Sequence, residues 1–321
     1  MQPDPVRPAG PGRVPPESLA ALAEGGTAAA GEPILLADRS DGTVVRVGDT
    51  VAKAHAAGTD PAALTTRLRV AADPALEGVL LAPVAPVEAV QVDGRSATVW
   101  PYGPPVDPDS PARAPWTEAG ALLGRLHSVG LAPLRARVGP LPRMRGPLRA
   151  AAAVARLRAA DPPPPAAART TVELAWARLP RWCRGEEEPP ADRGRALCHG
   201  DFHLGQLVRH PGPSGEWHLI DIDDLGVGDP AWDLARPAAW TAAGLLPPAA
   251  WEALLAGYRR HRETGADPWP WLDTPARALT VQSAALALER AARERRPLDE
   301  DESALVDSCS RIVELSRSVR T

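Results

Sequence analysis

The chain has 321 residues, enough for two lobes, and a formal net charge of −4. This charge, with no run of Lys and Arg, argues against nucleic-acid binding, and no apolar stretch approaches the ~20 residues that span a membrane. The start, Met1 to Pro16, lacks the apolar core of a secretory signal. The three cysteines have neither metal-ligand nor disulfide-framework spacing. We therefore expect a cytoplasmic protein without nucleic-acid or membrane partners; the oligomeric state stays open.

The first hundred residues predict a poorly ordered segment followed by a small β-rich lobe. Residues 1–30 are rich in Pro, Gly and Ala, with a short helix expected at 17–23. Alternating apolar residues then predict strands at 34–37, 43–47, 50–55, 84–92 and 95–100. Asp93-Gly94 joins the last two strands as a hairpin turn. A helix is expected from Pro61 to Ala72, because proline suits a first helical turn.

Beyond a stiff, proline-rich connector at 100–105, the pattern becomes helical. Apolar periodicity predicts helices at 116–129, 148–160, 171–182, 230–242, 248–262, 274–293 and 301–319. The predicted class is α+β: a β-rich N-lobe over residues 31–103 and a larger, mostly helical C-lobe over residues 104–321.

One polar loop and the strand after it have the layout of a phosphoryl-transfer site. Residues 199–206 read His-Gly-Asp-Phe-His-Leu-Gly-Gln, and Asp221 follows twenty residues after Asp201. In such sites one carboxylate orients the acceptor hydroxyl and takes its proton, while an amide and a second carboxylate hold the metal that bridges the ATP phosphates. The flanking residues predict a short antiparallel ribbon with both acids near its ends.

A distant lysine fits the same chemistry. Lys53 is the only lysine among 36 basic residues and lies on the predicted Val-Ala-Lys strand. A compact ammonium can sit between phosphates and a carboxylate, whereas arginine presents a wide planar fork. Lys53 is therefore the candidate phosphate anchor of a kinase-type strand.

These residues resemble the aminoglycoside phosphotransferase-like family, small-molecule kinases with a protein-kinase-like two-lobe fold. The resemblance lies in residues 199–206, Leu-Ile-Asp at 219–221 and Gly-Asp-Pro-Ala-Trp-Asp-Leu-Ala at 228–235, and extends diffusely over 33–320. It implies that Asp201 is the catalytic base and that Lys53 contacts the α- and β-phosphates. It also implies that Asp221 is the main Mg²⁺ ligand, with Gln206 as the second.

The resemblance implies further roles around these residues. A backbone donor for the nucleotide base would come from Tyr102 or Gly103, because Pro101 has no N–H. Ser40, in the hairpin at 38–43, would help to cradle phosphate. The supporting residues expected under the loop are His199, His203, Asp233 and His127.

Three departures from the family pattern are visible. Gln206 stands where the family usually has asparagine, although its amide oxygen can still ligate a metal. The helix at 61–72 has no Glu to pair with Lys53, so Asp60 or Asp73 substitutes, or the pair is missing. The phosphate-covering hairpin has a single glycine.

The favoured hypothesis is a Mg²⁺-dependent kinase that moves the γ-phosphoryl group of ATP (or GTP) to a hydroxyl of a small molecule. Aminoglycoside-like antibiotics, sugars and amino alcohols all fit as acceptors. The alternative is a pseudokinase that binds nucleotide or a small ligand without turnover. A metallohydrolase built on His199, Asp201 and His203 would leave Lys53 and Asp221 without a role. The acidic residues 186–188 and 299–302 either face solvent or attract a cationic substrate.

Overall fold

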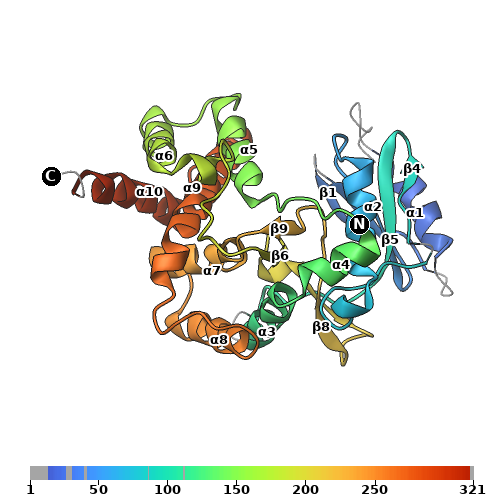
Figure 1. Cartoon of the computed structure of the whole chain (residues 1–321). Helices are drawn as coiled ribbons and strands as arrows, with labels where there is room; N and C mark the ends of the chain where they lie inside the picture. Colours follow the sequence, from blue (N-terminus) through green and yellow to red (C-terminus); the bar gives the residue numbers. More distant parts are fainter. Residues whose placement is uncertain (1–13, 27–30, 40–41, 86, 111–112, 319–321) are drawn as a thin grey trace. The chain divides into compact units, whose positions relative to one another are not determined.

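The computed structural model describes residues 14–26, 31–39, 42–85, 87–110 and 113–318 (Figure 1). The chain forms two compact units, each assembled from separate stretches of sequence. The N-terminal unit comprises residues 1–111, 130–142 and 205–223. The C-terminal unit comprises residues 112–129, 143–204 and 224–321. None of the helices in the described ranges is long and apolar enough to cross a membrane.

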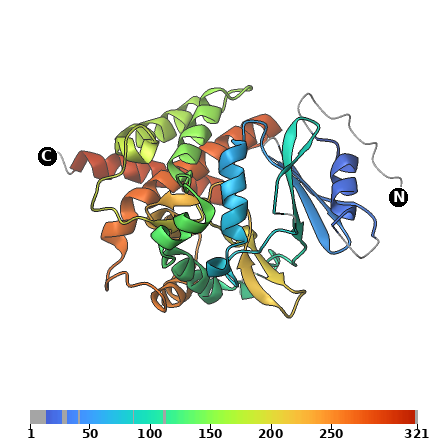
Figure 2. The same ribbon diagram turned by 45° about the vertical axis from the view of Figure 1, so that its right-hand side comes forward.

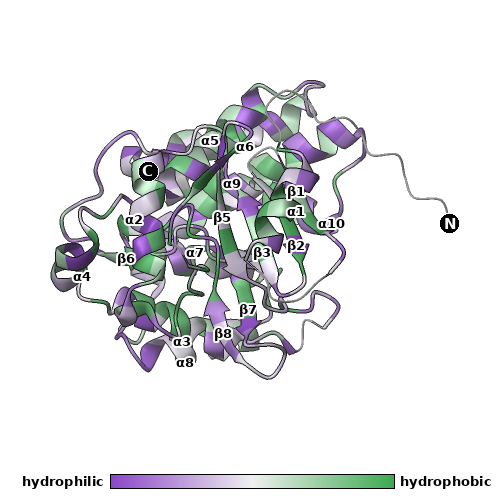
Figure 3. Cartoon of the chain, turned by 90° about the vertical axis from the view of Figure 1, so that its right-hand side faces the viewer, coloured by the Kyte–Doolittle hydropathy of each residue, from purple (hydrophilic) through white to green (hydrophobic). Residues whose placement is uncertain are grey.

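The N-terminal unit is built on an antiparallel sheet whose strands are largely apolar (Figure 3). Its order is β1-β2-β3-β5-β4. The strands are β1 (Ile34–Arg39), β2 (Gly42–Val47), β3 (Thr50–Ala54), β4 (Val90–Val92) and β5 (Arg95–Pro101). The five predicted strands are thus confirmed, but β4 is shorter than the predicted 84–92. The sequence has a proline at 86, which cannot donate to a ladder.

Lys53 lies on the central strand of this sheet. It is opposite Val44 of β2 and Thr98 of β5. Its neighbours Ala52 and Ala54 are buried in the apolar cluster beneath α1. Because successive side chains on a strand point to opposite faces, the Lys53 side chain lies on the face away from that cluster.

The N-terminal segment contributes directly to the core of this unit. The helix expected at 17–23 is confirmed as α1 (Pro16–Glu24), which packs against the sheet (Figure 2). It buries Leu19, Ala20 and Ala23 against Val45 and other sheet residues. The rest of the segment expected to be poorly ordered, residues 1–13 and 27–30, lies outside the described residues.

Two helices and a ribbon complete the N-terminal unit. The predicted helix is α2 (Pro61–Ala71), capped by Asp60, which accepts from the amide of Ala62 at 2.9 Å. Helix α4 (Leu131–Val138) was not predicted, because it is only two turns long and has too few positions for a periodic pattern. The expected antiparallel ribbon is confirmed as β7 (Leu207–His210) and β8 (Glu216–Leu219).

The C-terminal unit is mainly helical, as predicted. Its described helices are α3 (Trp116–His127), α5 (Gly146–Arg158), α6 (Ala166–Arg178), α7 (Ala231–Ala243), α8 (Pro248–Arg259), α9 (Trp269–Glu294) and α10 (Glu300–Ser318). The long helix α9 packs against α5, α6, α7 and α10 (Figure 1). A two-stranded sheet, β6 (Ala196–Cys198) with β9 (Gly226–Gly228), carries the loop that begins at His199.

Helices α3 and α8 meet at glycines. A Cβ atom added to Gly257 of α8 would collide with the carbonyl oxygen of Thr117, and one added to Gly120 of α3 would collide with the carbonyl oxygen of Leu254. The backbones of the two helices therefore touch, and no side chain larger than hydrogen fits at either position.

Replacing Gly257 by alanine should lower the free energy of unfolding by about 1–3 kcal/mol, because the added methyl group forces two helix backbones apart. Chemical denaturation of the variant measures the change. Gly58→Ala is the control, since nothing lies within 4 Å of a Cβ at that exposed turn. Equal stability of the two variants would contradict the close approach of α3 and α8.

Candidate active site

Lys53 is held by two carboxylates within the N-terminal unit. Its Nζ lies 2.7 Å from Asp221 Oδ1 and 3.0 Å from Asp223 Oδ2, and 16% of its side chain is exposed. Burial alone would lower the pKa of Lys53, but the negative charges of Asp221 and Asp223 raise it above its ordinary value. The ammonium therefore stays protonated, and it is directed toward the segment that follows β8.

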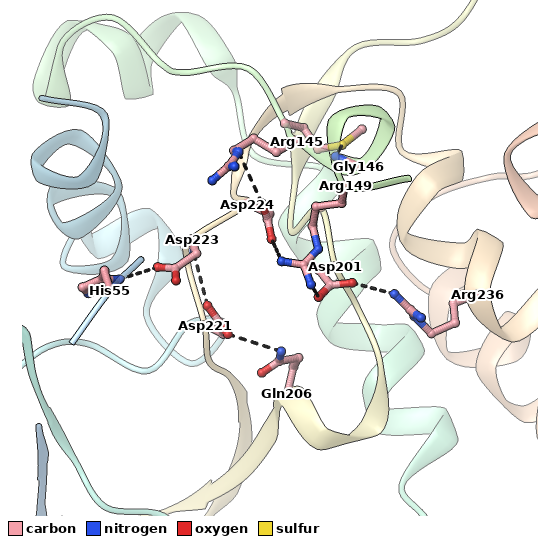
Figure 4. A network of polar contacts seen from close by, with 12 residues as sticks. His55, Arg145, Gly146, Arg149, Asp201, Gln206, Asp221, Asp223, Asp224 and Arg236 are labelled. Atoms are coloured by element: carbon pink, nitrogen blue, oxygen red, sulfur yellow. Dashed lines mark hydrogen bonds and ion pairs between the residues drawn. The ribbon is translucent and has the colours of Figure 1, made fainter. Parts of the chain in front are cut away.

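Asp223 is the second carboxylate of this group and has a buried partner of its own. Its Oδ1 lies 2.6 Å from His55 Nδ1 (Figure 4). His55 Nε2 lies 2.8 Å from Thr98 Oγ1. Burial alone would raise the pKa of Asp223, but the charge of Lys53 and the hydrogen bond from His55 lower it. Asp223 is thus an ionised carboxylate fixed between Lys53 of β3 and His55, which directly follows that strand.

The prediction that Asp60 or Asp73 pairs with Lys53 is wrong. Asp60 caps α2, and Asp73 accepts from Arg137 Nε at 2.7 Å and Nη2 at 2.8 Å. The lysine partner comes instead from the Asp-x-Asp sequence after β8. Asp221 and Asp223 are two positions apart, and both carboxylates lie within 3.0 Å of Lys53 Nζ.

Asp221 has a strained backbone, and its carboxylate lies near amide groups. Its φ of 64° is in the left-handed region, which residues other than glycine rarely adopt. The Asp223 amide donates to Asp221 Oδ1 at 3.3 Å, and Gln206 Nε2 lies 3.4 Å from Asp221 Oδ2 (Figure 4). Such strain persists where the surrounding contacts hold it, and it concentrates at functional sites.

These residues fit a hard divalent cation. Asp221 supplies carboxylate oxygens with a third of its side chain exposed, and rotating the Gln206 amide by half a turn would present its oxygen instead of its nitrogen. Mg²⁺ is bound by one or two carboxylates together with substrate phosphates. Asp221 and Gln206 are therefore able to hold it.

Asp201 belongs to the C-terminal unit, where two arginines bind its carboxylate. Arg236 Nη2 lies 2.6 Å from Asp201 Oδ1, and Arg149 Nη2 lies 2.9 Å from Asp201 Oδ2 (Figure 4). Arg236 Nε also donates to the carbonyl oxygen of Phe202 at 3.3 Å. Each carboxylate oxygen keeps a second lone-pair site for another donor.

The loop that carries Asp201 is anchored from below by Asp233. Its buried carboxylate accepts from the amides of His199 at 2.6 Å and Gly200 at 2.7 Å. It also lies 2.9 Å from His127 Nε2, whose Nδ1 is 2.8 Å from the Tyr258 hydroxyl. Burial alone would raise the pKa of Asp233, but the His127 hydrogen bond and charge lower it. The loop backbone is thus fixed by an ionised, fully buried acid.

The remaining predicted residues have simpler surroundings. His203 is half-buried in the Asp201 loop, and Ser40 lies outside the described residues. The Tyr102 amide donates to the carbonyl oxygen of Asp49 at 2.7 Å, and Arg46 stacks on the Tyr102 ring at 3.5 Å. Of the two amides proposed for the nucleotide base, that of Tyr102 therefore already has an acceptor.

Arg149, Arg236 and His55 were missed by the sequence analysis. In a chain with one lysine and 35 arginines, no single arginine carries a signal. His55 is the last residue of the predicted strand at 50–55 and was not assigned a role, because its contact with Asp223 joins residues 168 positions apart.

Residues 34–274 match the phosphotransferase enzyme family. The match covers most of the chain, which therefore belongs to this family, as the motif resemblance predicted. No curated protein matches the chain.

Solved structures share the fold, which is that of the small-molecule kinases with a protein-kinase-like architecture. Amicoumacin kinase hAmiN, in complex with AMP-PNP, Ca²⁺ and Ami, has a TM-score of 0.59 and 18% identity, over 92% of this chain and 91% of that one. A choline/ethanolamine kinase family protein from Mesorhizobium loti has a TM-score of 0.55 and 18% identity, over 89% and 88%. A thermostable mutant of aminoglycoside phosphotransferase APH(4)-Ia, with ADP and hygromycin B, has a TM-score of 0.56 and 15% identity, over 92% and 97%.

The contacts of Asp233 predict that even its replacement by asparagine, which has nearly the same shape, strongly lowers the free energy of unfolding. Asp233→Asn replaces one acceptor oxygen by an NH₂ donor that faces a loop amide or His127. The free energy of unfolding should therefore fall by about 3 kcal/mol. Chemical denaturation at neutral pH measures this loss. The control Asp273→Asn removes a half-exposed ion pair with Arg277 and should cost less than about 1 kcal/mol.

The stability of Asp233→Asn should also depend on pH differently from that of wild type. Because the pKa of Asp233 is lowered by folding, its contribution to stability is present above the ordinary carboxylate pKa and is lost as the pH falls through the folded value. The stability gap between wild type and Asp233→Asn should therefore narrow on acidification. A gap that widens would show that Asp233 is not ionised in the folded protein.

Proposed function

We propose that this protein is a Mg²⁺-dependent kinase that transfers the γ-phosphoryl group of ATP to a hydroxyl of a small molecule. The observation that carries the proposal is the position of Lys53, the only lysine of the chain, on a central strand against Asp221 and Asp223. A protonated ammonium on such a strand, directed at the candidate metal ligand, is the phosphate-anchoring arrangement of kinases. The solved kinases with nucleotide analogues or ADP support ATP as the donor.

Each residue then has a distinct task. Lys53 contacts the α- and β-phosphates, and the amide of Gly103 is the donor to the base. Asp221 and Gln206 hold the metal, which neutralises charge on the phosphates when it is bound. The strained backbone of Asp221 keeps its carboxylate directed at Lys53 before any ligand arrives, which lowers the reorganisation needed for transfer.

Asp201 orients the acceptor hydroxyl and takes its proton. The hydroxyl oxygen attacks the γ-phosphorus, the bond from that phosphorus to the ADP oxygen breaks, and the proton passes to a carboxylate oxygen of Asp201. Arg149 and Arg236 hold this carboxylate in one orientation. Asp233 keeps the loop backbone fixed through the amides of His199 and Gly200.

The proposal favours turnover over a pseudokinase. The two departures that suggested an inactive protein were Gln206 and the missing helix glutamate. The Gln206 amide reaches to 3.4 Å from Asp221, so its longer side chain does not remove it from the metal ligands. Lys53 has a carboxylate partner in Asp223, so it does not need an acid on α2.

The direct test is Asp201→Asn in an ADP-release assay with a panel of hydroxylated metabolites and antibiotics. Loss of the proton acceptor should reduce kcat by about 10²–10⁴-fold on any acceptor that wild type phosphorylates. Asp109→Asn, at an exposed turn, is the control and should keep wild-type activity. Full activity of Asp201→Asn on an identified acceptor would overturn the assignment of the base.

A second test addresses the lysine partner. Asp223→Asn leaves Lys53 with one carboxylate, so the ammonium loses its fixed position and ATP should bind about tenfold more weakly. Isothermal titration with ATP in the absence of metal measures this without relying on catalysis. Asp60→Asn is the matched control, because asparagine caps a helix as well as aspartate. Equal ATP affinity in the two variants would rule out the role given to Asp223.

A further inference from the structure

Three arginines of the C-terminal unit gather around two carboxylates, one of which is the proposed base. We call Arg145, Arg149 and Arg236 the arginine cluster. Arg149 joins the two acids, with Nη2 2.9 Å from Asp201 Oδ2 and Nη1 2.9 Å from Asp224 Oδ2 (Figure 4).

The three arginines of the cluster come from two helices. Arg145 immediately precedes α5, and Arg149 lies in its first turns. The Arg145 amide donates to the carbonyl oxygen of Asp224 at 3.2 Å, which fixes the start of α5 against the segment after β8. Arg236 comes from α7. The start of α5, which carries Arg145 and Arg149, is therefore held beside Asp224.

The three arginines differ in the fraction of the side chain that is exposed to solvent. Arg236 has 12% of its side chain exposed, Arg149 has 32% and Arg145 has 47%. Arg145 makes the weakest contact, with Nε 3.6 Å from Asp224 Oδ1. Arg236 acts mainly as a clamp on Asp201, whereas Arg145 and Arg149 retain surface for another ligand.

The charges around Asp201 disfavour a cationic acceptor. Three guanidinium groups face two carboxylates in this cluster, so positive charge is in excess beside the reacting position. An ammonium on the acceptor would approach two guanidinium groups, whereas an anionic oxygen would add a bidentate partner. The acidic residues Glu186, Glu187 and Glu188 do not offset this, because each lies within 4 Å of an arginine.

We propose that the acceptor carries an anionic group, a carboxylate or a phosphate, near the hydroxyl that is phosphorylated, and that Arg145 and Arg149 bind this group. The inference rests on the proposed kinase function and narrows it to hydroxy acids and phosphorylated alcohols. Amino alcohols and aminoglycosides are then poor acceptors.

Matched acceptors that differ only in charge test the proposal. ADP release is measured with glycerate, glycerol 2-phosphate, glycerol and 2-amino-1,3-propanediol, and with glucuronate, glucose 6-phosphate, glucose and glucosamine. We expect kcat/KM to be at least about tenfold higher for an anionic member than for the neutral and amino members of its series. Comparison of carboxylate with phosphate identifies the group. Preference for an amino member would overturn the proposal and leave the kinase function standing.

Variants at the accessible end of the cluster provide the second arm. Arg145→Ala should lower kcat/KM for the preferred anionic acceptor about tenfold and change that of the neutral member by less than twofold. Arg158→Ala, on the same helix and half exposed beside Glu173, is the control. An equal loss for charged and neutral acceptors in Arg145→Ala would mean that Arg145 only supports the fold.

A binding measurement decides the matter even if no acceptor in the panel is phosphorylated. At constant ionic strength, sulfate in place of chloride should raise the Tm of wild type, and this rise should be smaller in Arg145→Ala and unchanged in Arg158→Ala, because both variants keep the general stabilising effect of sulfate. A sulfate effect that is absent, or unchanged in Arg145→Ala, would overturn the anion site. Absence of ADP release with all acceptors, together with the expected sulfate effect, would overturn the kinase function alone.

Discussion

The pairing of one partly buried ammonium with two carboxylates is the constraint on which the N-terminal unit depends. Lys53 projects from the central strand of the sheet, and leaving its charge without a partner would be strongly destabilising. Asp221 and Asp223 supply the compensation. The ribbon β7–β8 therefore belongs with the N-terminal sheet although it begins more than 100 residues after β5 ends, and the left-handed backbone of Asp221 is held in place by the same contacts.

Most of the fold followed from patterns that are local in sequence. The strands around Lys53, the ribbon after the His-Gly-Asp loop and the long helices have the apolar periods of their elements, and the structure contains them in the predicted order. The failures were also local in origin. Helix α4 is too short for a periodic signal, and a proline in the sequence at 86 limits β4.

The residues of the candidate site could be predicted only where they lie close together in the sequence, at a spacing that is typical of a phosphoryl-transfer site. Asp201, Gln206 and Asp221 lie within one loop and one ribbon, so their separation was informative. The side chains that hold the acidic residues of the site come from distant parts of the sequence. Arg149 is 52 positions before Asp201, and His55 is 168 positions before Asp223. Arg149 could not be singled out in a sequence so rich in arginine, and His55 and Asp223 become neighbours only in the folded chain.

The threading of the chain has a consequence for its synthesis. The N-terminal unit is formed by residues 1–111, 130–142 and 205–223. Strands β1 to β5 are synthesised first, and their contacts within this unit are complete only after residues 205–223 have been synthesised. A nascent chain of between 53 and 220 residues contains Lys53 but neither Asp221 nor Asp223 to neutralise it. Cotranslational folding, which favours units that finish early, is thus delayed here until about two thirds of the protein has been translated.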